Sequence, residues 1–212
     1  MEFLNATGGV PNLENSVHRT ATLKWLRKWG CRQFAVRDNS RASTELRRWY
    51  AEHSGKLFQQ SKNIWELSDR DYEIIKNAYA ELIHLRASSR HQGNRRNTKV
   101  RFGPTAAAKI LFTIRPAGLA PWDRPIRKEL SLNGTPQSYV AYIKRVAEML
   151  ERLKPACTAN GFTLSDLPTK LLRSSSSVPK LIDEYYWVTI TKKWKLPDST
   201  VLDNWSRWGH RD

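Results

Sequence analysis

The sequence predicts an all-α fold, and three observations support this prediction. Apolar residues recur at three- and four-residue steps in several segments, as on the buried face of a helix. Helix-start signals precede two of these segments, at residues 68–71 and 135–136. One segment, "YYWVTIT" at residues 185–191, has strong β-propensity but no apparent partner strand. The 212 residues, 40% of them hydrophobic, suffice for one compact helical domain over residues 1–212, and two helical lobes with a cleft between them are an alternative arrangement.

Two helices are expected in the first quarter of the chain, over residues 20–29 and 42–53. Gly30 provides a stop for the first, and Gly55 follows shortly after the second. The residues with helical spacing are Leu23, Trp25, Leu26 and Trp29 in the first segment and Leu46, Trp49 and Tyr50 in the second.

The clearest helix is expected over residues 69–85, because Ser68 and Asp71 form a capping signal at its start. Its apolar stripe consists of Tyr72, Ile75, Tyr79, Leu82 and Ile83. A further helix should start at Thr135 and Pro136 and end before Pro155. After a solvated loop at residues 174–177, two more helices are expected over residues 179–194 and 198–208.

A basic tract, "RASSRHQGNRRNTKVRF" at residues 86–102, has six Lys or Arg and no acid. Its Gly, Asn and Ser content predicts a loop. Two interpretations remain open: a solvated, mobile loop, or a loop that contacts phosphates. The tract leads into "FGPTAAAK", where a helix begins and unpaired backbone N–H groups would be able to hold a phosphate.

The formal net charge of +16 indicates a polyanionic partner. Nucleic acid is the first candidate and a membrane surface is its competitor. No stretch approaches the roughly 18 apolar residues of a spanning helix and no signal peptide is visible, so we expect a cytoplasmic, nucleoid-associated protein that does not bind membranes. Cys31 and Cys157 are too few for a metal cluster, and the five histidines lack metal-ligand spacing, so no metal or other cofactor is expected.

Residues 100–127, "VRFGPTAAAKILFTIRPAGLAPWDRPIR", resemble the signature of the helix-hairpin-helix DNA glycosylase superfamily, which includes endonuclease III and the oxoguanine and alkyladenine glycosylases. Gly103 matches the second glycine of the hairpin, Pro104 and Thr105 open the following helix, and Asp123 falls at the position of the catalytic aspartate. Arg101 replaces the first hairpin glycine. Thr105 occupies the position of the Schiff-base lysine of the bifunctional members, and the four-cysteine cluster of the endonuclease III branch is absent.

The resemblance implies a helix-hairpin-helix glycosylase-like helical domain and a monofunctional DNA glycosylase that leaves an abasic site. Loss of a base builds positive charge on the sugar, and a carboxylate such as Asp123 would stabilise that charge and orient water. Arg115, Arg124 and Arg127 would favour its ionised form and hold phosphates. An alternative is that Asp123 only caps a short helix that contains Pro125. The two roles are compatible.

The expected partner is double-stranded DNA with one nucleotide flipped out, bound by a monomer. The expected DNA-binding residues are Arg95, Arg96, Lys99, Arg101, Gly103, Thr105, Arg124 and Arg127. The expected walls of the base pocket are Trp122, Tyr72, Tyr79 and Trp65, although Trp122 is equally well explained as a core residue.

Two substrates remain possible. A damaged base would make the protein a repair enzyme, and the glucosylated hydroxymethylcytosine of phage DNA would make it an antiviral-defence enzyme. Two non-catalytic alternatives are a DNA-binding module and a scaffold that binds RNA or the ribosome. The roles of Lys109, Asp183, Glu184 and residues 185–187 are also left open.

Overall fold

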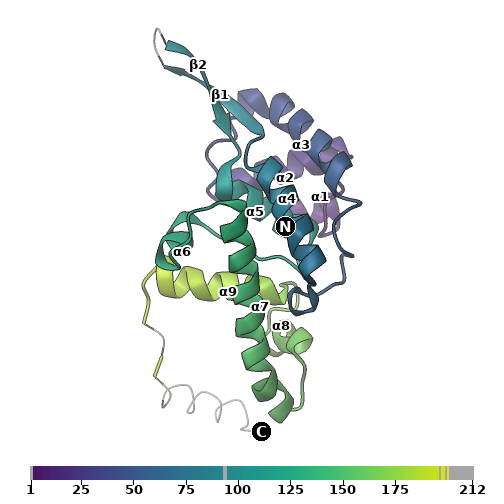
Figure 1. Cartoon of the computed structure of the whole chain (residues 1–212), viewed down its shortest axis with the longest axis vertical. Coiled ribbons are helices and arrows are strands. Elements are labelled where there is room, and N and C mark those ends of the chain that lie inside the picture. The colour runs from purple at the N-terminus through teal and green to yellow at the C-terminus, as the bar shows by residue number, and fades with distance from the viewer. Residues whose placement is uncertain (1, 93–94, 196, 199, 201–212) are drawn as a thin grey trace.

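The computed structural model describes residues 2–92, 95–195, 197–198 and 200, with side chains of residues 3–89 and of those from 98 onward. This part of the chain is mostly helical, and its strands form one two-stranded ribbon (Figure 1). The all-α prediction is therefore confirmed for the body of the molecule.

The N-terminal half supplies four helices before the ribbon. The second, third and fourth match the predicted helices to within four residues at each end; the third ends at His53 and the fourth starts at Asp69, as predicted. The four helices are α1 (Glu2–Thr7), α2 (Ser16–Lys28), α3 (Asn39–His53) and α4 (Asp69–Leu82), with 3₁₀ turns η1 (Val36–Asp38) and η2 (Ile64–Glu66). Ser68 and Asp71 form the predicted capping box of α4. Gly30 follows the end of α2 with a φ of +83°, a left-handed conformation that favours glycine.

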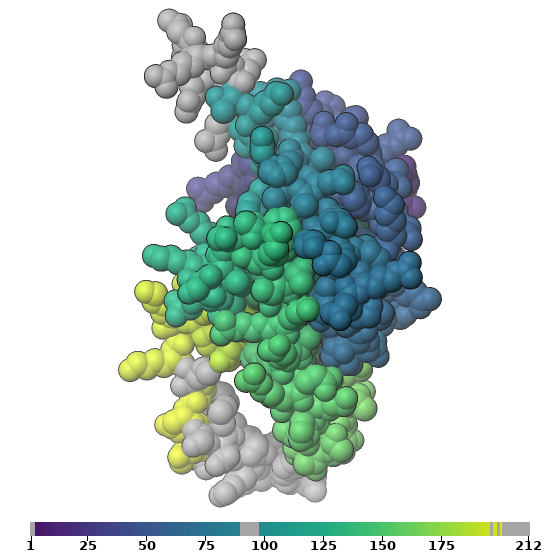
Figure 2. Space-filling view, in the orientation of Figure 1, coloured from purple at the N-terminus to yellow at the C-terminus, as the bar shows by residue number. Residues whose placement is uncertain are grey.

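The basic tract differs from expectation, because it is an antiparallel β-ribbon and not a loop. Strands β1 (Arg86–Gln92) and β2 (Arg95–Arg101) pair from Arg86 opposite Arg101 to Gln92 opposite Arg95. The base of the ribbon is held by the body, since Ser88 Oγ donates to Gln33 O over 2.7 Å and Gln33 Nε2 donates to Phe102 O over 2.7 Å. The ribbon extends beyond the helices of the body (Figure 1), and its base packs beside α3 (Figure 2).

The second half of the chain begins with α5 (Gly103–Ile114), α6 (Arg124–Glu129) and the long α7 (Pro136–Ala159). Contrary to expectation, α7 does not end before Pro155. Pro155 lies in an exposed stretch near the end of the helix, where water can bond the carbonyl that the missing N–H leaves unpaired.

The C-terminal elements are η3 (Leu164–Asp166), α8 (Leu167–Lys170), α9 (Val178–Tyr186) and the π-helical turn η4 (Trp187–Thr191). The "YYWVTIT" segment is therefore helical, as predicted. The helix predicted at residues 198–208 lies almost entirely outside the described residues.

A cluster of buried aromatic side chains, which we call the aromatic cluster, joins α4 and α7 to the segment before α6. Its members are Tyr79, Trp122, Tyr139 and Tyr142, each 0% exposed. Tyr139 Oη donates to Ala120 O over 3.1 Å, Tyr142 Oη to Pro121 O over 2.9 Å, and Trp122 Nε1 to Pro104 O over 3.1 Å. The cluster thus fixes the backbone that leads into Asp123.

Candidate functional site

Asp123 lines a cavity of about 460 Å³, which we call the Asp123 cavity. Its walls come from the end of α2, the middle of α5, the start of α6, and α9 with the following π-helical turn. The lining residues are Trp29, Lys109, Asp123, Arg173, Lys180, Asp183, Glu184, Trp187 and Val188. Segments distant in the sequence therefore combine acids, amines and aromatic rings in one place.

Asp123 has two structural partners besides its position on the cavity. Its backbone is extended, and Oδ1 accepts a hydrogen bond from the backbone N–H of Ile126 over 3.0 Å, so the residue is the N-cap of α6. Thr191 Oγ1 donates to Oδ2 over a longer 3.4 Å. The carboxylate is half-buried. Capping thus occupies one oxygen strongly and orients the other.

Lys109 brings a buried cation to the same cavity. It is 5% exposed, its ammonium donates to the backbone carbonyl of Trp29, and Nζ lies 4.3 Å from the centroid of the Trp29 ring. Burial lowers the pKa of Lys109, and the negative charges of Asp183 and Asp123 partly oppose this shift. The carbonyl and ring of Trp29 hold the amine against one wall.

Asp183 is the second carboxyl group of the cavity, and it is 7% exposed. Burial raises the pKa of Asp183, although Lys180 and Lys109 act in the opposite direction. Lys180 forms an ion pair with Asp183 and lies 4.8 Å from the Trp29 ring centroid. The two carboxyl groups therefore have different environments, an arrangement that separates acid and base roles in other active sites.

Trp187 is the more exposed aromatic ring of the cavity, at 42%. Lys192 Nζ lies 4.8 Å from its ring centroid, whereas two ammonium groups, those of Lys109 and Lys180, lie over Trp29. The sequence left the role of Trp187 open and indicated only that Trp29 belongs to a helix. A useful signal was the four-residue step between Asp183 and Trp187, which places both on one side of a helical segment.

The four residues predicted to line a base pocket lie elsewhere. Trp122 and Tyr79 belong to the aromatic cluster, as the core interpretation of Trp122 requires. Tyr72 is partly buried and its ring lies 4.6 Å from Lys144 Nζ. Trp65 is also partly buried against the core. None of the four belongs to the described lining of the Asp123 cavity.

Three of the predicted DNA-binding residues lie together at the junction of α5 and α6. Arg127 Nη1 donates to Thr105 Oγ1 over 2.9 Å, and its guanidinium lies 5.3 Å from the Trp122 ring centroid. The N–H of Gly103 donates to Ile83 O over 3.0 Å, so it is already bonded within the protein.

The other predicted DNA-binding residues lie on the surface or on the ribbon. Lys99, Arg101 and Arg124 are exposed, and Arg101 contacts His84. Arg95 and Arg96 belong to β2, and their side chains lie outside the described part of the structure.

Arg115 is an interior residue, so it is not available to hold a phosphate beside Asp123. It is 7% exposed, and its guanidinium donates to the carbonyls of Phe58, Ile114 and Ser54. Arg115 was expected to lie near Asp123 only because the two residues are close in the sequence. Its role is to join the end of α5 to the segment after α3.

A larger cavity of about 970 Å³ adjoins the Asp123 cavity and shares Arg173, Lys180 and Glu184 with it. Apolar rings and small polar groups line this second cavity, among them Phe3, Trp25, Phe112, Ser175, Ser176 and Ser177. Ser177 Oγ is buried and has no hydrogen-bond partner in the described structure. The two cavities together offer much more space than the Asp123 cavity alone.

Comparisons with protein-family models, curated proteins and solved structures give no match to this chain. Within the described residues, no helix is both long and apolar enough to cross a membrane.

Proposed function

We propose that the protein is a monofunctional DNA glycosylase with a helix-hairpin-helix-like helical domain, and that Asp123 is its catalytic residue. The observation that carries the proposal is the position of this carboxylate, which caps α6 and also lines a cavity with a buried amine and a second carboxyl group. The resemblance of residues 100–127 to the glycosylase signature supports the assignment of this site to base release.

Asp123 acts on the sugar of a flipped nucleotide. As the glycosidic bond stretches, positive charge develops at C1′, and the carboxylate stabilises it and orients the attacking water. The N–H of Ile126 and the Thr191 hydroxyl hold the carboxylate in place, so little reorganisation accompanies the reaction.

Asp183 and Trp187 act on the base. Because burial raises the pKa of Asp183, its carboxyl group keeps a proton to higher pH than an exposed aspartate, which suits it to protonate the departing base. The half-exposed Trp187 ring gives a surface on which that base stacks.

DNA binding is assigned to the exposed cations of the ribbon and of α6. Lys99, Arg101 and Arg124 are exposed, and the chain carries a formal net charge of +16. Contacts of this type neutralise phosphates and predict binding that weakens steeply with salt.

The two neighbouring cavities favour a base with a bulky substituent. The Asp123 cavity, at about 460 Å³, is already within the usual range of small-molecule sites, about 300–1,000 Å³. The adjoining 970 Å³ adds aromatic rings and hydroxyl groups, which suit a sugar substituent better than a bare damaged base. Glucosylated hydroxymethylcytosine is therefore the substrate to test first, with damaged bases as the alternative.

The decisive variant is Asp123→Asn, because asparagine caps helices about as well as aspartate but carries no charge. We expect base release to fall at least about 1,000-fold, while DNA affinity and the unfolding midpoint stay near those of the native protein. Base release is measured by alkaline cleavage of abasic sites in normal, uracil-containing, oxidised, alkylated and phage-modified DNA.

Asp166→Asn is the matched control, since Asp166 is an exposed capping-box acid that lies outside the cavity lining. The control should keep full activity. Native activity in Asp123→Asn would leave Asp123 as a helix cap and assign catalysis to another residue. DNA binding without base release on any of these substrates would make the protein a non-catalytic DNA-binding module.

Hydrolysis by water, without an imine intermediate, is part of the proposal because Thr105 has no amine and Lys109 is held by Trp29. Borohydride reduction during the reaction should therefore trap no covalent protein–DNA adduct. An adduct that disappears in Lys109→Gln would show instead that Lys109 attacks the sugar.

A further inference from the structure

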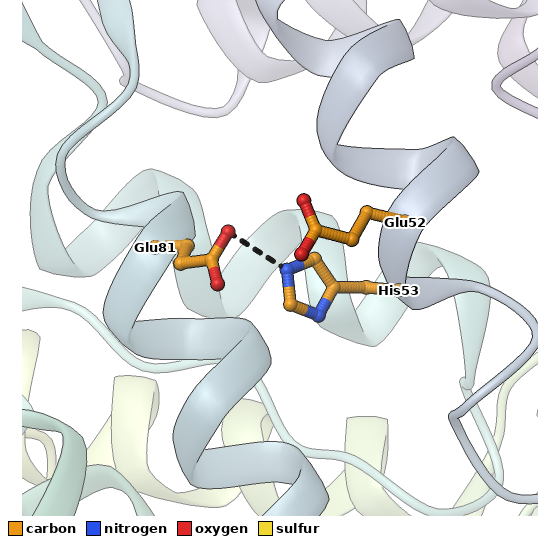
Figure 3. A group of neighbouring side chains, drawn as sticks. All are labelled: Glu52, His53 and Glu81. Atoms are coloured by element: carbon orange, nitrogen blue, oxygen red, sulfur yellow. Dashed lines mark ion pairs between the residues drawn. The ribbon is translucent and has the colours of Figure 1, made fainter.

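Glu52, His53 and Glu81 bring three metal-binding groups together on a face of the molecule that the proposed reaction does not use. Glu52 and His53 end α3, and Glu81 lies in the last turn of α4 (Figure 3). One ligand atom from each residue lies within 4.8 Å of the others. None of these residues lines the two cavities described above.

His53 is the buried member of the cluster, with its side chain 5% exposed and its ring stacked on Trp49 at a centroid distance of 5.4 Å. Its Nε2 lies 3.0 Å from Glu81 Oε2 but makes no hydrogen bond with any described residue. The ring is therefore fixed by packing, while Nε2 faces the two carboxylates without a well-aligned partner (Figure 3). Buried polar atoms without such a partner are rare and point to a missing ligand.

The two carboxylates can complete a site without disturbing the core. Glu52 and Glu81 are 53% and 54% exposed at the side chain, so rotamer changes move them at little cost. Ligands about 2.0–2.2 Å from a tetrahedral ion lie roughly 3.3–3.5 Å apart. The 3.0 Å between His53 Nε2 and Glu81 Oε2 therefore opens slightly, and the other separations, at most 4.8 Å, close by no more than about 1.5 Å. The competing cation is Lys56, whose Nζ is 3.8 Å from Glu52 Oε1 and whose side chain is 61% exposed.

We propose that Glu52, His53 and Glu81 bind a divalent transition-metal ion such as Zn²⁺ and so join the end of α3 to α4. One imidazole and two carboxylates suit Zn²⁺ better than Mg²⁺ or Ca²⁺, which prefer oxygen ligands throughout. Water completes the coordination. The site is structural, because it links two helices and contacts neither cavity.

The test uses the full chain, stripped of metal by a chelator and titrated with Zn²⁺ alone in a calorimeter. We expect one Zn²⁺ site per chain that is weakened at least about tenfold in both Glu52→Gln and Glu81→Gln. Zn²⁺ at about 100 times its Kd should raise the unfolding midpoint of the native chain by roughly 5–10 °C.

Glu73→Gln is the matched control, since Glu73 is an exposed acid on α4 that pairs with Lys76. It should bind Zn²⁺ like the native chain. Both glutamine variants change exposed side chains, and circular dichroism checks that they fold. Absence of a stoichiometric site, or binding that persists unchanged in Glu52→Gln and Glu81→Gln, would overturn the proposal and leave a His53–Glu81 ion pair. Because the cluster is separate from Asp123, this result is independent of glycosylase activity.

Discussion

Trp122 and Asp123 are neighbours in the sequence, yet they belong to two contrasting regions. The Trp122 side chain belongs to the aromatic cluster, where the polar side-chain atoms donate hydrogen bonds to backbone carbonyls. Asp123 lines a cavity that also holds the buried Lys109 and Asp183, and burial lowers the pKa of Lys109 and raises the pKa of Asp183. The aromatic cluster has the features of a scaffold, and the cavity those of a reactive site.

The cluster also explains how the cavity keeps its charges in place. Tyr139 and Tyr142 bond the carbonyls of Ala120 and Pro121, directly before Asp123. The position of the carboxylate is therefore determined by uncharged groups that do not respond to pH near neutrality. Changes in the cavity should mainly alter activity, whereas changes in the cluster should first alter stability.

The largest effect expected on the cavity side, after loss of Asp123, comes from Asp183→Asn. Asparagine cannot protonate a base, so we expect base release to fall about 100-fold. In the native protein burial raises the pKa of Asp183, so its acid form is present at low pH and is lost as pH rises through that pKa. The rate of base release should therefore decline as the pH rises through that pKa, and this decline forms the alkaline limb of the pH–rate profile.

A pH–rate profile of base release checks this, because Asp183→Asn should lack the limb. A native-like profile in the variant would exclude Asp183 as the acid. Asp183 is buried and paired with Lys180, so an unfolding curve for the variant is needed beside the kinetics.

On the scaffold side, Tyr142→Phe should reduce the free energy of unfolding by about 1–3 kcal/mol. The change leaves the buried carbonyl of Pro121 without its hydrogen bond. Urea unfolding measures the loss, and Tyr185→Phe, at an exposed ring, is the control. If Tyr142→Phe were as stable as the native chain, the cluster would not be the scaffold described here.

The smallest effect is expected outside both regions, at the ribbon. The double variant Lys99→Ala, Arg101→Ala should weaken DNA binding several-fold and reduce the slope of log K against log salt by about two. Arg152→Ala, Lys154→Ala removes two exposed charges from α7 and serves as the control. Equal slopes in the two variants would remove the ribbon from the DNA interface.

The sequence predicted the elements whose signals are local. The capping box at Ser68 and the apolar stripe identified α4, and Asp123 was recognised as a possible N-cap. The ribbon was missed because Ser88 and Phe102 of the tract are anchored by Gln33, which lies far outside the tract in the sequence. Pro155 was misjudged because exposure, which reduces the cost of a missing N–H, is not visible in the sequence.

The site was only partly predictable for the same reason. Asp123 was identified through spacing from Gly103, but its cavity combines helix ends that are distant along the chain. Large aromatic residues were expected at the pocket. Those close to Asp123 in the sequence, such as Trp122, are buried in the core instead. The proposed metal-binding cluster likewise joins adjacent residues of α3 to one residue of α4, a spacing that no short motif describes.

The way the ribbon is inserted between α4 and α5 allows its length to change without a change in the helical body. The chain leaves the helical body at Ile83 and returns at Gly103, whose N–H bonds the Ile83 carbonyl over 3.0 Å. The separation of α4 from α5 is therefore independent of the length of the excursion between them. Adding or removing paired residues near the tip would lengthen or shorten the arm by about 3.4 Å per pair and leave the body unaltered, so the reach of the arm can change without a change in the cavity.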